Sequence, residues 1–133
     1  MIVDTSALIA VLLGEPEAAG LAEAMATRPV AISSATLVEA RIVVESKTGS
    51  RGRRRLEELL ETVRAEVVPV DERQAMLATE AYRDYGRGSG SPARLNFGDC
   101  FSYALAMARR EELLFIGDDF GHTDVRRPET RGE

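Results

Sequence analysis

Four short acidic segments, far apart in the sequence, carry the residues of this chain whose types and spacing could do chemistry. Each acidic residue stands beside apolar residues near the predicted edge of a strand or helix: Asp4, Glu39, Asp99, and the pair Asp118 and Asp119. Carboxylates gathered in one pocket repel one another, so the pocket is unstable until a hard divalent cation neutralises it. Such a site has the chemistry of a metal-dependent phosphodiesterase.

Asp4 is the strongest single candidate, because it closes an apolar N-terminal run. An ionised carboxylate is costly to bury there unless it is paired or bound to a metal. The alternative is that Asp4 caps the helix that follows. Asp99 stands in the first turn of a predicted helix, where Gly98 allows close approach of the backbone; its alternative role is a negative charge favoured by the helix dipole.

Glu39 borders the inward side of its predicted helix, whereas Glu45, six positions on, is turned away and is interpreted as a surface residue. Asp118 and Asp119 are adjacent and point in different directions. Asp119, next to Phe120, is the better candidate for the site.

Two hydroxyl residues, Thr5 and Ser6, can donate hydrogen bonds to a carboxylate or cap the following helix. His122, the only histidine, is interpreted as a surface residue, and Cys100 as a buried core residue with no partner that would activate its thiol.

Composition places few limits on function. The 133 residues are 44% hydrophobic and 29% charged, which predicts a single domain over residues 1–133. The single cysteine excludes an internal disulfide. No apolar run reaches the ~18 residues of a membrane span, and the N-terminus lacks a signal-peptide pattern. We therefore expect a cytoplasmic protein without a membrane partner.

The net charge of −5 argues against general nucleic-acid affinity, yet the arginines are clustered. Arg83, Arg87 and Arg94 flank a Gly- and Ser-rich stretch at 86–92, and others gather at 51–55. Around a metal-loaded pocket they could hold a phosphate chain. We expect binding of such a chain to weaken with salt and when Arg87 and Arg94 are replaced together.

The pattern of apolar residues and turn signals predicts an alternation of strands and helices. Strands are predicted at 1–3, 29–33, 66–70 and 113–116, and helices at 7–13, 15–27, 34–47, 53–64, 72–85 and 98–110, with a break at Gly49 and a frayed tail at 126–133. This alternation favours a mostly parallel sheet of four or five strands covered on both faces, a three-layer α/β/α domain. Ligands of such sheets bind beyond the carboxyl ends of the strands.

The ordered set of motifs is similar to the PIN-domain ribonucleases. The segments that carry the resemblance are Met1–Leu8, Glu39 in the helix after the second strand, Leu95–Phe101 and Leu113–Phe120. Within that group the chain most resembles the VapC toxins of bacterial toxin–antitoxin pairs, over nearly its whole length. The segment His122–Val125 resembles the final short strand of the family.

The resemblance implies a toxin-type endoribonuclease that depends on Mg²⁺, with Mn²⁺ as a substitute, and is neutralised by a cognate antitoxin. Asp4, Glu39 and Asp99 match the core acidic residues, and Asp118 or Asp119 matches the fourth. We expect Asp4 and Asp99 to hold the metal, with Glu39, Asp118 or Asp119 as further candidate ligands. The expected RNA is a single-stranded segment such as a tRNA loop.

A homodimer is also expected. The family is usually dimeric, and the early helices carry more apolar side chains than one thin sheet is predicted to cover: Leu8, Ile9, Leu12, Leu13, Leu21 and Met25. The rival functions are a metal-dependent phosphatase or phosphotransferase and a catalytically silent binding module. Ser6, where an aspartyl-phosphate enzyme would have a second Asp, argues against the first, and the intact acidic residues argue against the second.

Overall fold

The computed structural model describes residues 1–130, and at their centre lies a sheet of four parallel strands. The strands are β1 (Ile2–Val3), β2 (Ala31–Ser33), β3 (Glu66–Val68) and β4 (Leu113–Leu114), in the order β3-β2-β1-β4. Ile2 pairs with Ala31 of β2 on one side and with Leu113 of β4 on the other. The predicted parallel sheet is confirmed, with four strands in the described part of the chain.

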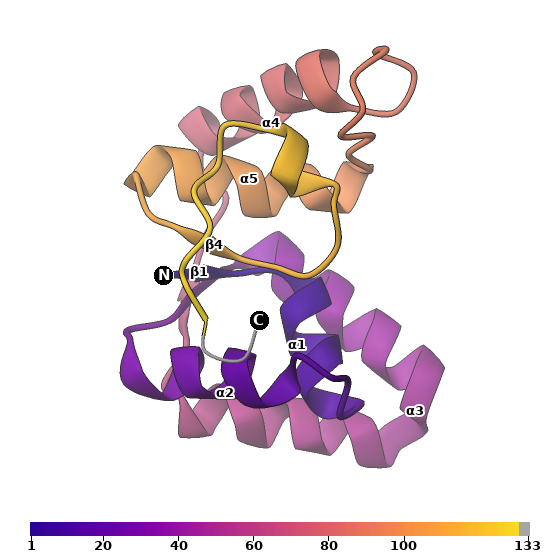
Figure 1. Ribbon diagram of the computed structural model, residues 1–133, viewed down its shortest axis with the longest axis vertical. Helices are drawn as coiled ribbons and strands as arrows, with labels where there is room; N and C mark the ends of the chain where they lie inside the picture. Colours follow the sequence, from indigo (N-terminus) through magenta and orange to yellow (C-terminus); the bar gives the residue numbers. More distant parts are fainter. Residues whose placement is uncertain (131–133) are drawn as a thin grey trace.

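Helices cover both faces of this sheet, as the three-layer prediction requires. They are α1 (Thr5–Leu12), α2 (Ala18–Thr27), α3 (Ser34–Thr62), α4 (Glu72–Tyr85) and α5 (Phe97–Arg109), followed by the short 3-10 helix η1 (Phe120–His122). Figure 1 shows α4 and α5 on one side of β1 and β4, and α1, α2 and α3 on the other. The chain moves from β1 outward to β3 and then returns to β4 beyond β1, so the strand order reverses at β1. This is where open α/β sheets place their ligands.

Each face of the sheet has its own hydrophobic core. Leu8, Leu21 and Met25 pack with Ile32 on the side of α1–α3, and Leu105, Phe115 and Phe120 pack with Ile2 on the side of α4 and α5. The first core accommodates the apolar residues of the early helices: among the large ones only Leu13 is highly exposed, at 46%. The expectation that these helices leave an apolar surface for dimerisation is therefore wrong, because their side chains bury against the chain itself.

Gly49 bends α3 sharply, in agreement with the predicted break. Its backbone has φ 73° and ψ −166° inside an otherwise helical span. Arg41 forms a two-point ion pair with Glu57, sixteen residues further on. In a straight helix those residues would be about 24 Å apart, so the second half of α3 folds back beside the first.

The segment after η1 forms no strand, so the expectation of a final strand at His122–Val125 is wrong. Backbone groups that would pair with a neighbouring strand bond instead to one side chain. The Thr123 hydroxyl accepts from the Val125 N–H and donates to the Phe120 carbonyl. The predicted tail begins with anchored residues. Leu113 N–H donates to the Arg126 carbonyl, and Arg127 stacks on Phe115. Residues 131–133 of that tail lie outside the described residues.

No helix among residues 1–130 is both long and apolar enough to cross a membrane.

Candidate functional site

Asp4 sits where β1 passes into α1, and its carboxylate is almost completely buried, with 3% of the residue exposed. It caps α1 through one oxygen, Oδ2, which accepts from the Ser6 N–H at 3.0 Å and the Ser6 hydroxyl at 2.7 Å. The other oxygen, Oδ1, accepts from the Ser102 hydroxyl of α5 at 2.6 Å. The two roles considered for Asp4 are thus compatible: it is a helix cap and a buried carboxylate held by three donors.

Glu39 reaches the same place from α3. The Thr5 hydroxyl donates to its Oε1 at 2.6 Å. Its second oxygen lies against Gly98, since an added Cβ at Gly98 would stand 1.8 Å from Glu39 Oε2. The glycine that precedes Asp99 therefore makes room for the glutamate of another helix, which is the close approach expected at Gly98.

Asp99 is held by the first turn of α5. Asn96 and Asp99 form a reciprocal capping box: the Asn96 side chain accepts from the Asp99 N–H at 2.8 Å, and Asp99 Oδ2 accepts from the Asn96 N–H at 2.9 Å. The predicted stabilising role at the helix start is therefore real. It occupies one carboxylate oxygen and leaves Oδ1 without a hydrogen bond among the described residues.

Electrostatics link these carboxylates to one another. Burial, together with the charges of Asp4, Glu39 and Asp119, raises the pKa of Asp99 to about 7 against the opposing hydrogen bond from Asn96. Burial also raises the pKa of Glu39, an effect that the Thr5 hydrogen bond opposes and the charge of Asp4 reinforces. Acidic residues from four separate segments thus act on one another electrostatically.

The adjacent acidic pair is divided by the turn after β4. Asp119 is the member whose charge raises the pKa of Asp99. Both residues are exposed, and both carbonyls accept a backbone N–H, that of Gly121 at Asp118 and that of His122 at Asp119. The effect on Asp99 is what favours Asp119 over Asp118 as the fourth acidic residue of the pocket.

Two residues of the site, Ser102 and Thr36, are absent from the sequence-based candidates. The Ser102 and Thr36 hydroxyls are 3.0 Å apart and both residues are buried. Their spacing carries a signal: Ser102 follows Asp99 by three positions and Thr36 precedes Glu39 by three, so each shares a helix face with an acidic residue. Together they connect α3 and α5 to Asp4.

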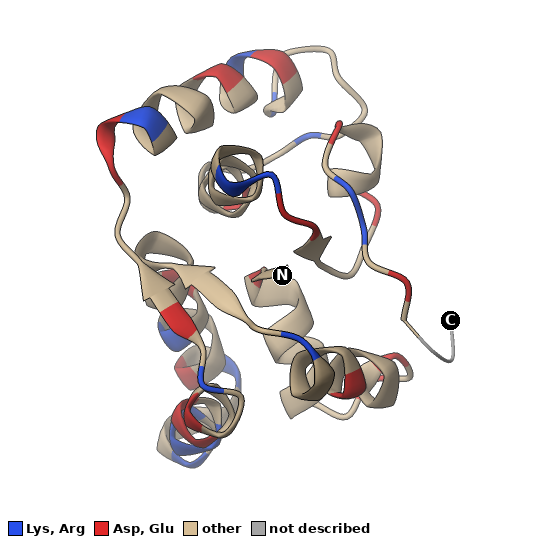
Figure 2. Cartoon of the chain, turned by 90° about the vertical axis from the view of Figure 1, so that its left-hand side faces the viewer, with Lys and Arg blue, Asp and Glu red and all other residues tan. Residues whose placement is uncertain are grey.

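The remaining polar candidates behave as expected or are engaged elsewhere. His122 is exposed and Cys100 is buried, where burial raises the pKa of the thiol to about 11. Arg83 pairs with Asp84, and Arg53 with Glu45 and Glu57. Acidic and basic residues are intermixed on the last turns of α3 (Figure 2), so the arginine cluster at 51–55 belongs to a mixed-charge surface.

The donor set fits a hard cation by its chemistry, since it consists of carboxylate oxygens. Within residues 1–130, no three His, Cys, Asp or Glu side chains are arranged as a ready metal cluster. Magnesium needs only one or two protein carboxylates and keeps several waters. Asp4 and Asp99 are two such carboxylates, and burial, together with the charges of the neighbouring acidic residues, raises the pKa of Asp99.

Comparisons with known proteins agree with this architecture. Residues 1–126 match the family model described as PIN domain. The chain is 56% identical over 128 residues to ribonuclease VapC28 of Mycobacterium tuberculosis, covering 96% of each. The crystal structure of M. tuberculosis VapC20, a toxin that cleaves the sarcin–ricin loop, superposes with a TM-score of 0.74 at 19% identity, covering 96% of this chain and 97% of that one. VapBC2 from Rickettsia felis, bound to a promoter DNA fragment, gives 0.74 at 16% identity and 97% coverage of both chains.

Proposed function

The chain belongs to the VapC family of PIN-domain ribonucleases, and we propose that its acidic pocket hydrolyses RNA phosphodiester bonds with a bound Mg²⁺, for which Mn²⁺ can substitute. The observation that supports this most directly is the meeting of the acidic segments: Ser102 of α5 donates to Asp4, and Glu39 of α3 lies against Gly98, next to Asp99. The charges of Asp4, Glu39 and Asp119 act on Asp99 accordingly. Helix capping alone would explain Asp4 and Asp99 separately. It would not bring four like charges together from four segments of the chain.

In the proposed mechanism each side chain has its own task. Asp4 and Asp99 would hold the cation, and Glu39 and Asp119 would complete the acidic pocket. When bound, the ion lowers the pKa of a coordinated water and stabilises negative charge on the phosphate. Ser6 and Ser102 orient the Asp4 carboxylate, and Thr5 orients Glu39. A hydroxyl donor fixes the direction of a carboxylate oxygen without adding a positive charge beside it.

The test is cleavage of a structured RNA by the purified protein in Mg²⁺, in Mn²⁺ and in EDTA. We expect cleavage with either ion, none in EDTA, and none with the Asp99→Asn variant in Mg²⁺. Asp71→Asn is the matched control, because Asp71 also caps a helix, α4, with its side chain accepting from Gln74 N–H. Cleavage that continues in EDTA, or at the wild-type rate in Asp99→Asn, would exclude the metal assignment.

The substrate we propose is a single-stranded segment such as a tRNA loop. RNA sequence is read mainly where bases are unpaired, and the chain has only seven aromatic residues, three Tyr and four Phe. Contacts to the backbone should therefore dominate. A loop should be cut much faster than a full duplex of the same sequence, and equal rates would overturn this part of the proposal.

We also propose that a cognate antitoxin neutralises the enzyme. The support is family membership, together with the Rickettsia felis VapBC2 structure, which contains both toxin and antitoxin. An antitoxin arginine entering the pocket would compete with the cation for its carboxylates. Co-expression with the cognate antitoxin should then suppress cleavage, and excess Mg²⁺ should partly relieve the inhibition.

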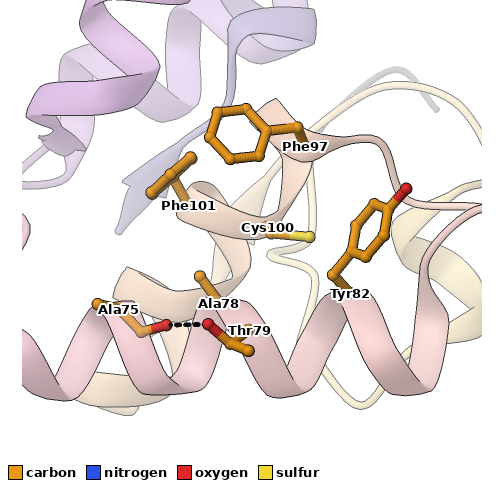
Figure 3. Close-up of a pocket in the computed structure, with 7 residues that line it drawn as sticks. All are labelled: Ala75, Ala78, Thr79, Tyr82, Phe97, Cys100 and Phe101. Carbon is orange, nitrogen blue, oxygen red and sulfur yellow. Dashed lines mark hydrogen bonds between the residues drawn. The ribbon is translucent and has the colours of Figure 1, made fainter.

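A homodimer remains part of the proposal, but through a different surface from the early helices. An apolar groove of about 350 Å³ runs between α4 and α5, lined by residues that include Ala78, Tyr82, Cys100 and Phe101. Figure 3 shows Phe97 beside Phe101 at the edge of this groove, and Phe97 is 75% exposed. A projecting ring and a receiving groove on one patch are what a two-fold interface needs, since each copy supplies both.

Light scattering at micromolar concentration tests this surface. Phe97→Ser should shift the protein from dimer to monomer. Leu13→Ser, which removes an exposed though less prominent leucine (46%) from the end of α1, should leave the dimer intact. If Leu13→Ser dissociates the dimer and Phe97→Ser does not, the interface lies on the early helices instead.

A further inference from the structure

A second cavity lies directly beside the acidic pocket and has the opposite charge on most of its wall. Its volume is about 420 Å³, and it is lined by Arg87, Gly88, Arg94 and Asp119. The chain connects the two places directly: Arg94 stands two residues before Asn96, whose N–H donates to Asp99 Oδ2 at 2.9 Å. Asp119, which lines this cavity, is one of the residues whose charge acts on Asp99. The cavity with the two arginines is therefore next to the acidic pocket.

The loop that presents these arginines is built to hold them in place. The Arg87 N–H donates to the Leu95 carbonyl at 3.0 Å, and the Leu95 N–H donates to the Tyr85 carbonyl at 2.9 Å, closing the two ends of the loop. Ala93 and Leu95, on either side of Arg94, are fully buried. With both neighbours anchored in the core, the exposed Arg94 projects from a fixed point.

Arg94 also has an unfavourable backbone conformation. Its φ of 51° lies in the left-handed region, as do those of Arg64 and Arg110. The latter two stand at or just beyond the C-terminal ends of helices, where this conformation is common, whereas Arg94 lies in the loop before α5, three residues ahead of its first residue, Phe97. A glycine would adopt the same φ without the steric penalty. Backbone strain at one residue often accompanies function, and here it accompanies an arginine beside a cavity.

The guanidinium groups are available for a ligand. Among residues 1–130, Arg87 and Arg94 make no ion pair and no side-chain hydrogen bond, whereas Arg28, Arg41 and Arg109 each pair with a glutamate. Guanidinium groups bind phosphate oxygens through two parallel hydrogen bonds. Two free arginines converging on one cavity are thus suited to a single phosphate group.

We propose that Arg87 and Arg94 together bind a backbone phosphate of the RNA next to the scissile one, and so position the strand across the acidic pocket. This inference rests on the proposed ribonuclease function. The scissile phosphate would lie at the carboxylates and their cation, and its neighbour would lie in the arginine cavity on the far side of Asp119. The pair would act on binding and alignment, with no role in the chemical step.

The experiment combines protein variants with a chemically altered substrate. Arg87→Gln and Arg94→Gly, singly and together, are compared with the wild type on a single-stranded RNA whose cleavage position has been mapped. Arg64→Gly is the matched control: it removes an exposed arginine from the same left-handed backbone, just before β3 and hence at the opposite end of the sheet. A second RNA carries one uncharged methylphosphonate linkage, placed in turn at each position flanking the cleavage site.

We expect the double variant to raise KM about tenfold or more, the range for hydrogen bonds to a charged group, with kcat and Mn²⁺ affinity nearly unchanged. One methylphosphonate position should weaken the wild type and Arg64→Gly by a similar factor but leave the double variant unaffected. If the double variant stays as sensitive as the wild type at every position, or its KM matches that of Arg64→Gly, the arginine cavity is not a phosphate site. If the wild type cleaves no RNA, the ribonuclease proposal itself is wrong. If the wild type cleaves RNA but the double variant behaves like it, only the phosphate site at Arg87 and Arg94 is wrong.

Discussion

Asp99 offers the sharpest quantitative test of the acidic pocket, because its charge should destabilise the metal-free fold. Its pKa is about 7 in the folded chain, against 3.8 for an ordinary aspartate. At 1.36 kcal/mol per pH unit this difference corresponds to at most about 4 kcal/mol. The carboxyl is partly solvated, so screening reduces the expected effect to about 2 kcal/mol.

The sign follows from linkage. A carboxyl whose pKa is raised on folding contributes stability that is fully present below the unfolded pKa and is lost as pH rises through the folded one. Without metal, the wild type should therefore lose stability, relative to Asp99→Asn, between about pH 4 and pH 7. Asparagine does not titrate, and its side-chain oxygen can still accept the Asn96 N–H of the capping box.

The assay is thermal and urea unfolding in EDTA from pH 4.5 to pH 8. By pH 8 Asp99→Asn should exceed the wild type by about 2 kcal/mol, or roughly 8 °C in Tm for a chain of this size. Mg²⁺ at about 100 times its dissociation constant should stabilise the wild type by about 2.7 kcal/mol and the variant much less. The control Asp71→Asn should show no gain as pH rises. A difference between Asp99→Asn and wild type that is the same at pH 5 and pH 8 would refute the reasoning.

Three further substitutions separate the roles of neighbouring groups. Asp4→Asn should destabilise the chain by about 1–3 kcal/mol in urea at neutral pH, since one amide oxygen cannot serve the three donors on Asp4; an unchanged midpoint would contradict this. Ser102→Ala should weaken Mn²⁺ binding about 10–100-fold by calorimetry, as loss of a group that orients a metal ligand does. Gly98→Ala should displace Glu39 and reduce RNA cleavage, while Gly121→Ala, whose added Cβ meets nothing within 4 Å, should not.

The first of these predictions differs from what the sequence suggests. Carboxylate repulsion alone predicts that neutralising either Asp4 or Asp99 spares the fold. The structure separates the two residues: Asp99 accepts one hydrogen bond from a backbone N–H, whereas Asp4 accepts three and is nearly inaccessible to water. Repulsion should dominate at Asp99 and lost hydrogen bonds at Asp4.

The layers of the fold can be predicted from local patterns, because apolar periodicity, Gly49 and the caps are properties of neighbouring residues. The hydrogen-bond partners of each carboxylate cannot be predicted in this way, because they come from distant segments: Ser102 is 98 positions from Asp4. The same limit explains the error over the early helices. Periodicity identifies Leu8, Leu21 and Met25 as apolar, but only the packing of α1 and α2 against α3 and the sheet decides that the chain itself buries them.

The acidic pocket can accept a cation because of the kind of hydrogen-bond donor that contacts its carboxylates. Several other carboxylates in residues 1–130 pair with arginines, as Glu57 does with Arg41 and Glu66 with Arg109. Asp4, Glu39 and Asp99 instead accept only from hydroxyl and backbone N–H groups, which orient an oxygen without cancelling its charge. A lysine or arginine among them would relieve the repulsion permanently and occupy the place of the metal. Arg87 and Arg94 instead line a separate cavity together with Asp119, so the charge of Asp4, Glu39 and Asp99 stays available to a cation, and the proposed phosphate site lies outside the ring of carboxylates.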